Sequence, residues 1–452
     1  MAHVLLTVGT NPLPILVAAR RLLLAGFARG ADLTLIHSPE TEQEAERILQ
    51  TLRAQLSLPG IPGTWHLHKL PIATEPKSIF ESVVGYLSTL PPNQAFHLHY
   101  TGGTKAMGLH TLEALLVVSS GSIEKSYLDP NGNILIDDSG QMVDPGVTDE
   151  RITWNMDLPT VAALHGFTLS FNLFRYGQLY SLVWGPHVPG VTILPNPQQF
   201  VDEPWLEIVR ALRPGFKTSN AHRAFFPNSD FWASEKRWPQ RFVPSPHTKG
   251  FEWPAETAWR NIPDMINQYF AANVFAASGT TYKYDPNVLS SQQSERLHGL
   301  LNNGWLELMA YDALRTVLTA IGRPFYICPS AHVGRGRNGQ MLKDDFELDV
   351  AVVLGYQLLV VSCTTSVEPK LLKGKGFEVI HRARQIGGDG ARAIVLSLAP
   401  ANTAKLVQNQ LHDDIGTREP PLTIWGWDDF QVLEARCREY LHKKLTWHKP
   451  FF

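Results

Sequence analysis

Cysteine is scarce in this chain. Only three cysteines occur among 452 residues, far apart and without a CxxC pair. This argues against a disulfide framework and against a zinc site, and it is typical of a cytoplasmic protein in a reducing compartment. No run of about 18 apolar residues is found, so we expect no membrane span. The first residues, MAHVLLTVGTNP, lack a basic region and a cleavage site, so they predict a first strand and not a signal peptide.

An excess of charge of either sign is missing too. The chain has 40 basic and 42 acidic residues and a net charge of -2, which excludes a globally basic nucleic-acid coat. Any nucleic-acid contact must therefore come from a local patch. With 44% hydrophobic and 18% charged residues, the composition is that of a soluble globular protein, and the length indicates two or three domains.

The chain is predicted to be an α/β protein. Residues 1–150 alternate strand and helix patterns, which indicates a Rossmann-like domain with a parallel sheet, followed by a hairpin around Asn131 and Gly132. Residues 151–294 are rich in Pro, Trp and Phe and are interpreted as a connecting or inserted region. A second α/β unit is expected over 295–452, beginning with an amphipathic helix over 301–322. The segment KLLKGKG, residues 370–376, is interpreted as a turn before the next helix.

Each early strand ends in a loop of small or hydroxyl-bearing residues: GTNP, SPET and YTGGTKAM. Loops at the carboxyl ends of parallel strands converge on one crevice, where the glycine amides at a helix start suit phosphate or ribose oxygens and a lysine adds positive charge. The alternative is a tight strand-to-helix turn with Thr104 as its N-cap. The candidate ligand residues are Thr10, Asn11, Ser38, Thr41, Thr101, Gly102, Gly103, Thr104, Lys105 and Met107.

This order of loops resembles the CARF domain, the sensor module of type III CRISPR ancillary proteins. The resemblance rests on Thr10 and Asn11 in the first loop and on 101–105 in the third. It implies a homodimer whose paired crevices bind a cyclic oligoadenylate, the tetra- or hexa-adenylate. A two-fold ligand is well matched by the same loops presented twice across a dimer axis.

The second unit contains carboxylates in an unusual setting. Glu307 lies in the first turns of a helix, and Glu347 and Asp349 lie two apart on a strand, hence on one face. Carboxylates that lie close together at a sheet edge cost free energy unless they are protonated, paired or bound to a cation. Ligand sets made only of oxygen atoms favour Mg²⁺ or Mn²⁺. We take Glu307 and Asp349 as metal ligands. Taken alone, Glu307 is more typical of a solvated helix face, whereas Asp349 lies beside the apolar run VAVVL, where an idle carboxylate is unusual.

The layout of GWLE on a helix, ELDV on a strand and LLVVSC on the next strand resembles the PD-(D/E)XK (restriction-endonuclease-like) nuclease domain of CARF-containing ancillary nucleases. Glu307, Asp349 and Ser362-Cys363 match that family, but Thr364 stands where the family carries a lysine. Lys370, Lys373 and Lys375 follow, and one of them is expected to supply the missing charge, although each is equally typical of a solvated surface. The catalytic candidates are Glu307, Glu347, Asp349, Ser362, Lys370, Lys373 and Lys375.

The resemblance implies a cyclic-oligoadenylate-activated, metal-dependent nuclease of DNA or RNA in antiviral defence. A sensor that has lost catalysis is an alternative because of Thr364, and so is an enzyme that opens the cyclic ligand with Lys105 as stabilising cation. Basic and aromatic residues interleave over 216–249, a pattern that suits single-stranded nucleic acid but is also typical of a local core.

Overall fold

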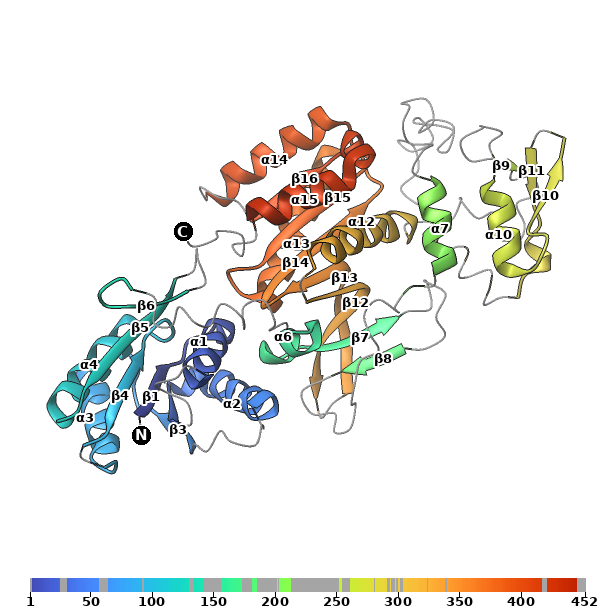
Figure 1. Ribbon diagram of the computed structural model, residues 1–452. Helices are drawn as coiled ribbons and strands as arrows, with labels where there is room; N and C mark the ends of the chain where they lie inside the picture. Colours follow the sequence, from blue (N-terminus) through green and yellow to red (C-terminus); the bar gives the residue numbers. More distant parts are fainter. Residues whose placement is uncertain are drawn as a thin grey trace.

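The computed structural model describes residues 2–24, 31–56, 64–91, 93–129, 134–141, 156–172, 181–184, 201, 203–212, 252–253, 261–279, 281–290, 293, 297, 300, 304–322, 324–337, 340–416 and 421–444. It contains an N-terminal sheet, a C-terminal sheet and a smaller three-stranded sheet (Figure 1). The predicted nucleic-acid segment over 216–249 lies outside the described residues, and so does the turn at Asn131 and Gly132.

The N-terminal sheet has the strand order β3-β2-β1-β4-β5-β6. Its first five strands are parallel, and β6 pairs antiparallel with β5. The bounds of its strands are β1 Ala2–Thr7, β2 Asp32–His37, β3 Trp65–Lys69, β4 Ala95–His99, β5 Ile123–Asp129 and β6 Ile134–Asp137. The predicted Rossmann-like parallel sheet and its terminal hairpin are confirmed.

Alternation along the strands divides the side chains between two cores. Val4 and Leu6 of β1 join the core that includes residues of α1 (Pro12–Leu24) and α2 (Glu42–Leu56). Leu5, between them in the chain, joins a second core with residues of α3 (Pro76–Leu87) and α4 (Lys105–Val118). Successive strand residues point to opposite faces, so the sheet is covered on both sides.

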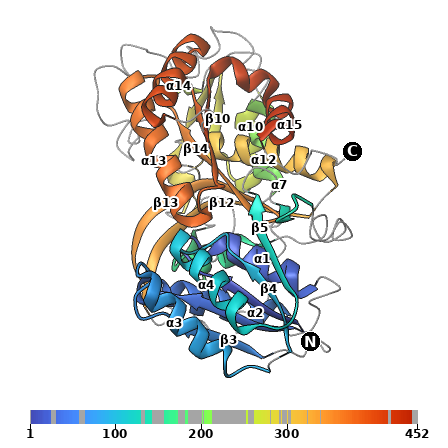
Figure 2. The ribbon, with the colours of Figure 1, turned by 90° about the vertical axis from the view of Figure 1, so that its left-hand side faces the viewer.

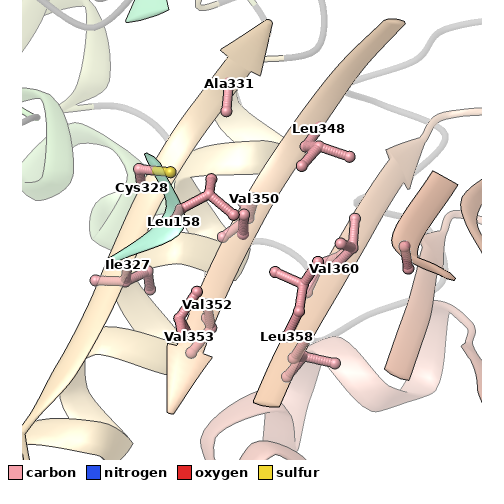
Figure 3. Packing of buried hydrophobic residues seen from close by; sticks show 14 of the residues in the cluster. Leu158, Ile327, Cys328, Ala331, Leu348, Val350, Val352, Val353, Leu358 and Val360 are labelled. Atoms are coloured by element: carbon pink, nitrogen blue, oxygen red, sulfur yellow. The ribbon is translucent and has the colours of Figure 1, made fainter. Parts of the chain in front are cut away.

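The C-terminal sheet is mixed and has the order β16-β15-β14-β13-β12-β7-β8. Two of its strands, β7 (Thr168–Asn172) and β8 (Ser181–Trp184), come from the segment that was predicted to be a connecting region. The others are β12 Phe325–Arg337, β13 Gln340–Leu354, β14 Gln357–Thr364, β15 Arg392–Ser397 and β16 Leu422–Trp425. The continuous apolar run of β14 is buried, as expected of a central strand, and Figure 3 shows Val350, Val352 and Leu358 among the side chains packed there.

Among the described residues, the helices that flank this sheet include α12 Trp305–Ile321, α13 Pro369–Gly387, α14 Ala401–Ile415 and α15 Leu433–Lys444. Figure 2 shows α13 and α14 on one side of the strands, and α12 and α15 on the other. The prediction of a turn over 370–376 is wrong, because α13 begins at Pro369 and runs through this segment. One of the two glycines there is explained by packing, since a Cβ on Gly376 would lie 2.5 Å from the Cδ1 of Leu411.

The middle segment contributes α7 (Glu203–Leu212), α10 (Ile262–Phe270) and a sheet of β9 (Glu252–Trp253), β10 (Phe275–Ser278) and β11 (Thr281–Tyr284). Helix α7 is held on α12 by charge. Arg210 donates two hydrogen bonds to the buried carboxylate of Asp312, at 3.1 and 2.7 Å, and it also pairs with Glu203 at 2.7 Å. Arg315 of α12 pairs with Glu203 at 3.2 Å and with Asp312 at 3.7 Å.

Helix α6 (Leu158–Leu164) lies at the junction of the two large units, in contact with α1, α2, α13 and β13. Arg47 of α2 donates to the Leu164 carbonyl at 2.9 Å, and the Met156 amide donates to the Gly355 carbonyl at 2.6 Å. No helix in the described ranges is both long and apolar enough to cross a membrane. All three cysteines are free thiols and are buried.

Candidate functional site

The first candidate site is built by loops at the carboxyl ends of β1 and β4, which touch each other. A Cβ on Gly9 would lie 2.8 Å from the Gly103 amide nitrogen, so a side chain at position 9 would prevent this close approach of the two loops. The Thr7 hydroxyl donates to the Gly102 carbonyl at 2.5 Å and fixes the third loop onto the first strand. Gly103 has φ +76°, a conformation that glycine adopts without strain.

Several predicted ligand residues instead stabilise these loops. The Ser38 amide donates to the Thr41 hydroxyl at 3.1 Å, and this hydroxyl donates to the Val8 carbonyl at 3.3 Å. The Thr101 hydroxyl accepts from the Leu128 amide at 2.6 Å. Ser38 and Thr41 are buried, as is Met107, whereas Thr10, Gly103, Thr104 and Lys105 are exposed. The exposed group is therefore the part of the prediction that a ligand can reach.

Thr104 is the N-cap of α4, as the alternative interpretation required. Its hydroxyl accepts from the Met107 amide and donates to the Ala73 carbonyl, both at 3.1 Å. Within the described ranges, no acceptor bonds the amides of Gly102 and Gly103. The N-cap and a site for an anion are compatible here, because the Thr104 hydroxyl satisfies only one of the backbone amides at the start of this helix.

Asn11 lies apart from the other residues of this group. Its amide side chain lies against Gly388 at the end of α13, where a Cβ would meet Asn11 Nδ2 at 2.5 Å. Its Oδ1 is 3.5 Å from Nε2 of His165, which follows α6. Asn11 thus joins the first loop to the C-terminal unit, one residue after the exposed Thr10.

The second candidate site centres on Asp349 of β13, which lies beside the carboxyl end of the neighbouring strand β14. The antiparallel register of β13 and β14 sets Asp349 beside Ser362. Asp349 Oδ2 accepts from the Cys363 amide at 2.6 Å and from the Ser362 hydroxyl at 3.2 Å. The pKa of Asp349 is raised to about 6, mainly by burial and also by the charge of Glu347, while the Cys363 amide and the Lys375 charge oppose the rise. This carboxylate is thus ionised at neutral pH, but at an energetic cost.

Glu347 is anchored from the other neighbouring strand. The Ser330 hydroxyl donates to Glu347 Oε1, and His332 Nε2 lies 3.8 Å from the same oxygen. Ser330 is buried and has φ 45°. Its neighbours Pro329 and Ala331 pair with Val350 and Leu348 of β13, but Ser330 itself does not pair with Asp349. A non-glycine residue held in this conformation beside two carboxylates is the kind of local strain that gathers at functional sites.

Glu307 is only 5% exposed, so it does not lie on a solvated helix face, as it would if judged alone. It faces the end of β14. Burial raises the pKa of the Cys363 thiol well above its usual range, and the nearby carboxylates of Asp349 and Glu307 add to this rise. The charges of Glu307 on the helix and Asp349 on the strand therefore both act on the Cys363 thiol, and their joint binding of a metal ion stays a prediction.

The three lysines after β14 are separated by their partners. Lys373 Nζ pairs with Asp414 at 2.7 Å, and Lys370 is exposed. Lys375 pairs with Glu378 at 3.1 Å, and its charge is also close enough to lower the pKa of Asp349. Among the three, Lys375 is therefore the one whose charge acts on Asp349. Thr364 itself accepts a hydrogen bond from the Ser366 amide at 3.2 Å.

The described ranges contain no group of three or more His, Cys, Asp or Glu side chains arranged to hold a metal ion. A pair of carboxylates is nevertheless what Mg²⁺ commonly takes from a protein, since it keeps several waters and binds substrate phosphates. Asp349 Oδ1 accepts no hydrogen bond from the described residues, and the raised pKa shows that this carboxylate lacks full compensation for its charge. On these grounds Asp349 Oδ1 has the chemistry of a ligand for a divalent cation.

Sequence reasoning missed three residues at this site. Ser330 and His332 lie two residues apart on β12, and only the strand pairing shows that His332 is opposite Glu347. Arg382 of α13 donates to the Glu347 carbonyl at 3.3 Å and lies over the Phe346 ring at 5.0 Å. No signal in the sequence separates this arginine from its neighbours on α13.

Comparison with known proteins identifies the fold and not a family. Neither a protein-family model nor a curated protein matches this chain. Among solved structures, the crystal structure of protein VC1899 from Vibrio cholerae is similar, with a TM-score of 0.61 and 13% sequence identity over 99% of each chain. The arrangement of an N-terminal parallel α/β unit and a C-terminal mixed sheet with helices is thus shared with that protein over its full length.

Proposed function

We propose that this protein is a metal-dependent nuclease whose activity is switched on by a cyclic oligoadenylate bound at the N-terminal loops, in type III CRISPR defence. The observation that carries the proposal is the setting of Asp349. Its carboxylate is held by the Cys363 amide and the Ser362 hydroxyl, has a pKa of about 6 and shares its surroundings with Glu307 and Lys375. Titratable groups perturbed in this way cluster at functional sites.

Each side chain has a separable task in this proposal. Ser362 and the Cys363 amide orient Asp349, so its free oxygen Oδ1 points away from the two donors. Glu307 supplies the second carboxylate from α12, and Ser330 fixes Glu347 two residues along the strand. A divalent cation held by Glu307 and Asp349 would supply Lewis-acid stabilisation to the phosphodiester under attack. Lys375 adds positive charge at the position where charge develops on the phosphate oxygens.

The N-terminal loops provide the proposed switch. Exposed Thr10, Gly103, Thr104 and Lys105 offer hydroxyl, amide and ammonium groups to a ligand that carries phosphates and riboses. Asn11 connects the first of these loops to the end of α13, the helix that carries Lys375. In this proposal the dimer exists in an inactive and an active state. A ligand shifts the equilibrium between them only by its difference in affinity for the two states.

The test is cleavage of labelled DNA and RNA with and without cyclic tetra- or hexa-adenylate, with Mn²⁺ or with a chelator. We expect cleavage only when ligand and metal are both present. Asp349→Ala should abolish it and leave ligand binding intact. Asp345→Asn, which changes an exposed carboxylate on the same strand, is the matched control and should cleave normally.

Other outcomes of the same assay identify the alternatives. Disappearance of the cyclic ligand without cleavage of nucleic acid would show a ligand-opening enzyme. Ligand binding without any cleavage would show a sensor. Cleavage that survives Asp349→Ala would mean that the assigned centre is wrong.

A further inference from the structure

The outer face of α13 combines cations with an exposed aromatic ring. Lys370, Gly374, Phe377, His381 and Arg384 follow one another at alternating steps of four and three residues, and all five are exposed. Residues at these steps share one side of a helix. At 1.5 Å per residue the stripe is about 21 Å long. We call these five residues the α13 stripe.

The charge of this helix differs from that of the chain. Helix α13 carries five Lys or Arg residues and one Glu, although the whole protein has a net charge of -2. Its single acid, Glu378, lies beside the stripe and pairs with Lys375 at 3.1 Å and with Arg382. Within the described ranges, Lys370 and Arg384 have no ion-pair partner. The stripe is therefore an exposed cationic surface with no acid of its own.

Gly374 adds an observation that the fold does not explain. A glycine inside a helix costs about 1 kcal/mol relative to alanine. A Cβ on Gly374 would meet nothing within 4 Å, so no internal packing requires the missing side chain. Gly376, two residues later, is required by its contact with Leu411. An exposed glycine between a lysine and a phenylalanine gives an external partner close access to the helix.

Charge decides which partner fits. A second copy of this chain docked by the same stripe would oppose Lys370 and Arg384 with the same cations, whether the helices ran parallel or antiparallel. Phosphates complement these cations, and a base with an open face stacks on Phe377, which is 41% exposed. Bases inside a duplex are stacked on each other, so a single strand fits best.

We propose that the α13 stripe binds single-stranded nucleic acid and leads it to the carboxylates, an inference that rests on the proposed nuclease function. The same helix reaches that site through Lys375, whose charge acts on Asp349, and through Arg382, which bonds the Glu347 carbonyl. The stripe and two residues that act on the candidate centre are thus carried by one helix. DNA and RNA share the chemistry that this face recognises.

The experiment measures fluorescence anisotropy of labelled dT20, rU20 and a 20-base-pair duplex with the full chain in a chelator, so that binding is separated from cleavage. Phe377→Leu should weaken single-strand binding roughly 5- to 150-fold, the loss of one stacked base. Arg384→Gln should lower the slope of log affinity against log salt by about 0.7, the loss of one phosphate contact. Gly374→Gln should weaken binding by obstructing the approach, whereas Gly374→Ala should raise the melting temperature.

Lys405→Gln is the matched control, because Lys405 is an exposed lysine on the neighbouring helix α14. It should change neither affinity nor salt slope. Unchanged binding in Phe377→Leu and Arg384→Gln, with wild-type affinity measurable and melting temperatures intact, would overturn the inference while leaving the nuclease proposal standing. Loss of dimer in Phe377→Leu, seen by sedimentation with unchanged nucleic-acid binding, would assign the stripe to a second copy instead. Stripe-dependent binding without ligand-activated cleavage would support the stripe and reject the nuclease.

Discussion

Replacing Asp349 with asparagine should stabilise the protein at neutral pH while removing a carboxylate that the proposed chemistry needs. An aspartate with a folded-state pKa of about 6, against 3.8 for the ordinary group, is harder to ionise in the folded chain than in the unfolded chain. At 1.36 kcal/mol per pKa unit, this difference amounts to about 3 kcal/mol at pH 7. Asparagine resembles the neutral acid in shape and carries no such cost.

The sign of the effect fixes its pH dependence. The folded state holds its proton more tightly, so its stability falls as pH rises from about 3.8 to about 6 and is constant above that window. The advantage of Asp349→Asn should be about 3 kcal/mol at pH 7, about half of that at pH 5, and close to zero at pH 3.

The assay is the unfolding of wild type and variant at these three pH values, by urea titration or thermal melt. An increase of about 6–12 °C in the melting temperature is expected at pH 7 for a domain of this size. Asp345→Asn should show no increase, since Asp345 is exposed. An Asp349→Asn protein that is no more stable than wild type at pH 7, or whose advantage persists at pH 3, would refute the claim that ionising this half-buried carboxylate is costly.

Two further effects on stability follow from buried charge. Burial lowers the pKa of His3 to about 4 and that of His99 to about 3, so each histidine should lower the free energy of unfolding by about 2 kcal/mol at pH 5, where the unfolded chain binds the proton more readily. In urea unfolding, the stability of a His99→Asn variant should fall by about 2 kcal/mol less than that of wild type between pH 7 and pH 5. An equal fall would contradict this expectation. Arg210→Ala should destabilise the protein by about 3 kcal/mol, because the buried carboxylate of Asp312 loses both of its hydrogen bonds from Arg210. A midpoint of urea unfolding equal to that of wild type would show that the Arg210–Asp312 pair contributes nothing to stability.

The strand and helix order could be predicted because each buried strand has a continuous or alternating apolar pattern. The same reasoning placed Asp349 correctly beside an apolar run, and it placed the TGGTK loop at the carboxyl end of a strand. It failed for 370–376, where two glycines suggested a turn. Helix α13 tolerates them because one packs against Leu411 and the other faces outward.

What the sequence could not supply is contact between distant segments. Strands β7 and β8 complete the C-terminal sheet, although about 150 residues separate β7 from β12. Asn11 belongs by sequence to a loop of the first unit, yet its side chain meets Gly388 of the second. Glu307 has the spacing of a surface residue, yet it is buried because its helix packs against the C-terminal sheet and the neighbouring helices. These contacts depend on tertiary packing, which local pattern does not encode.

The burial of all three cysteines makes the protein a convenient background for labelling. Cys328, Cys363 and Cys437 are enclosed, and burial raises the pKa of Cys328 and Cys363, so the reactive thiolate is scarce at each. A single cysteine introduced at exposed Thr10 or Lys405 would then be the only site that a maleimide dye reaches in the folded chain. With cysteines at both positions, the distance between the N-terminal loops and the C-terminal unit can be followed by energy transfer without first removing a native thiol.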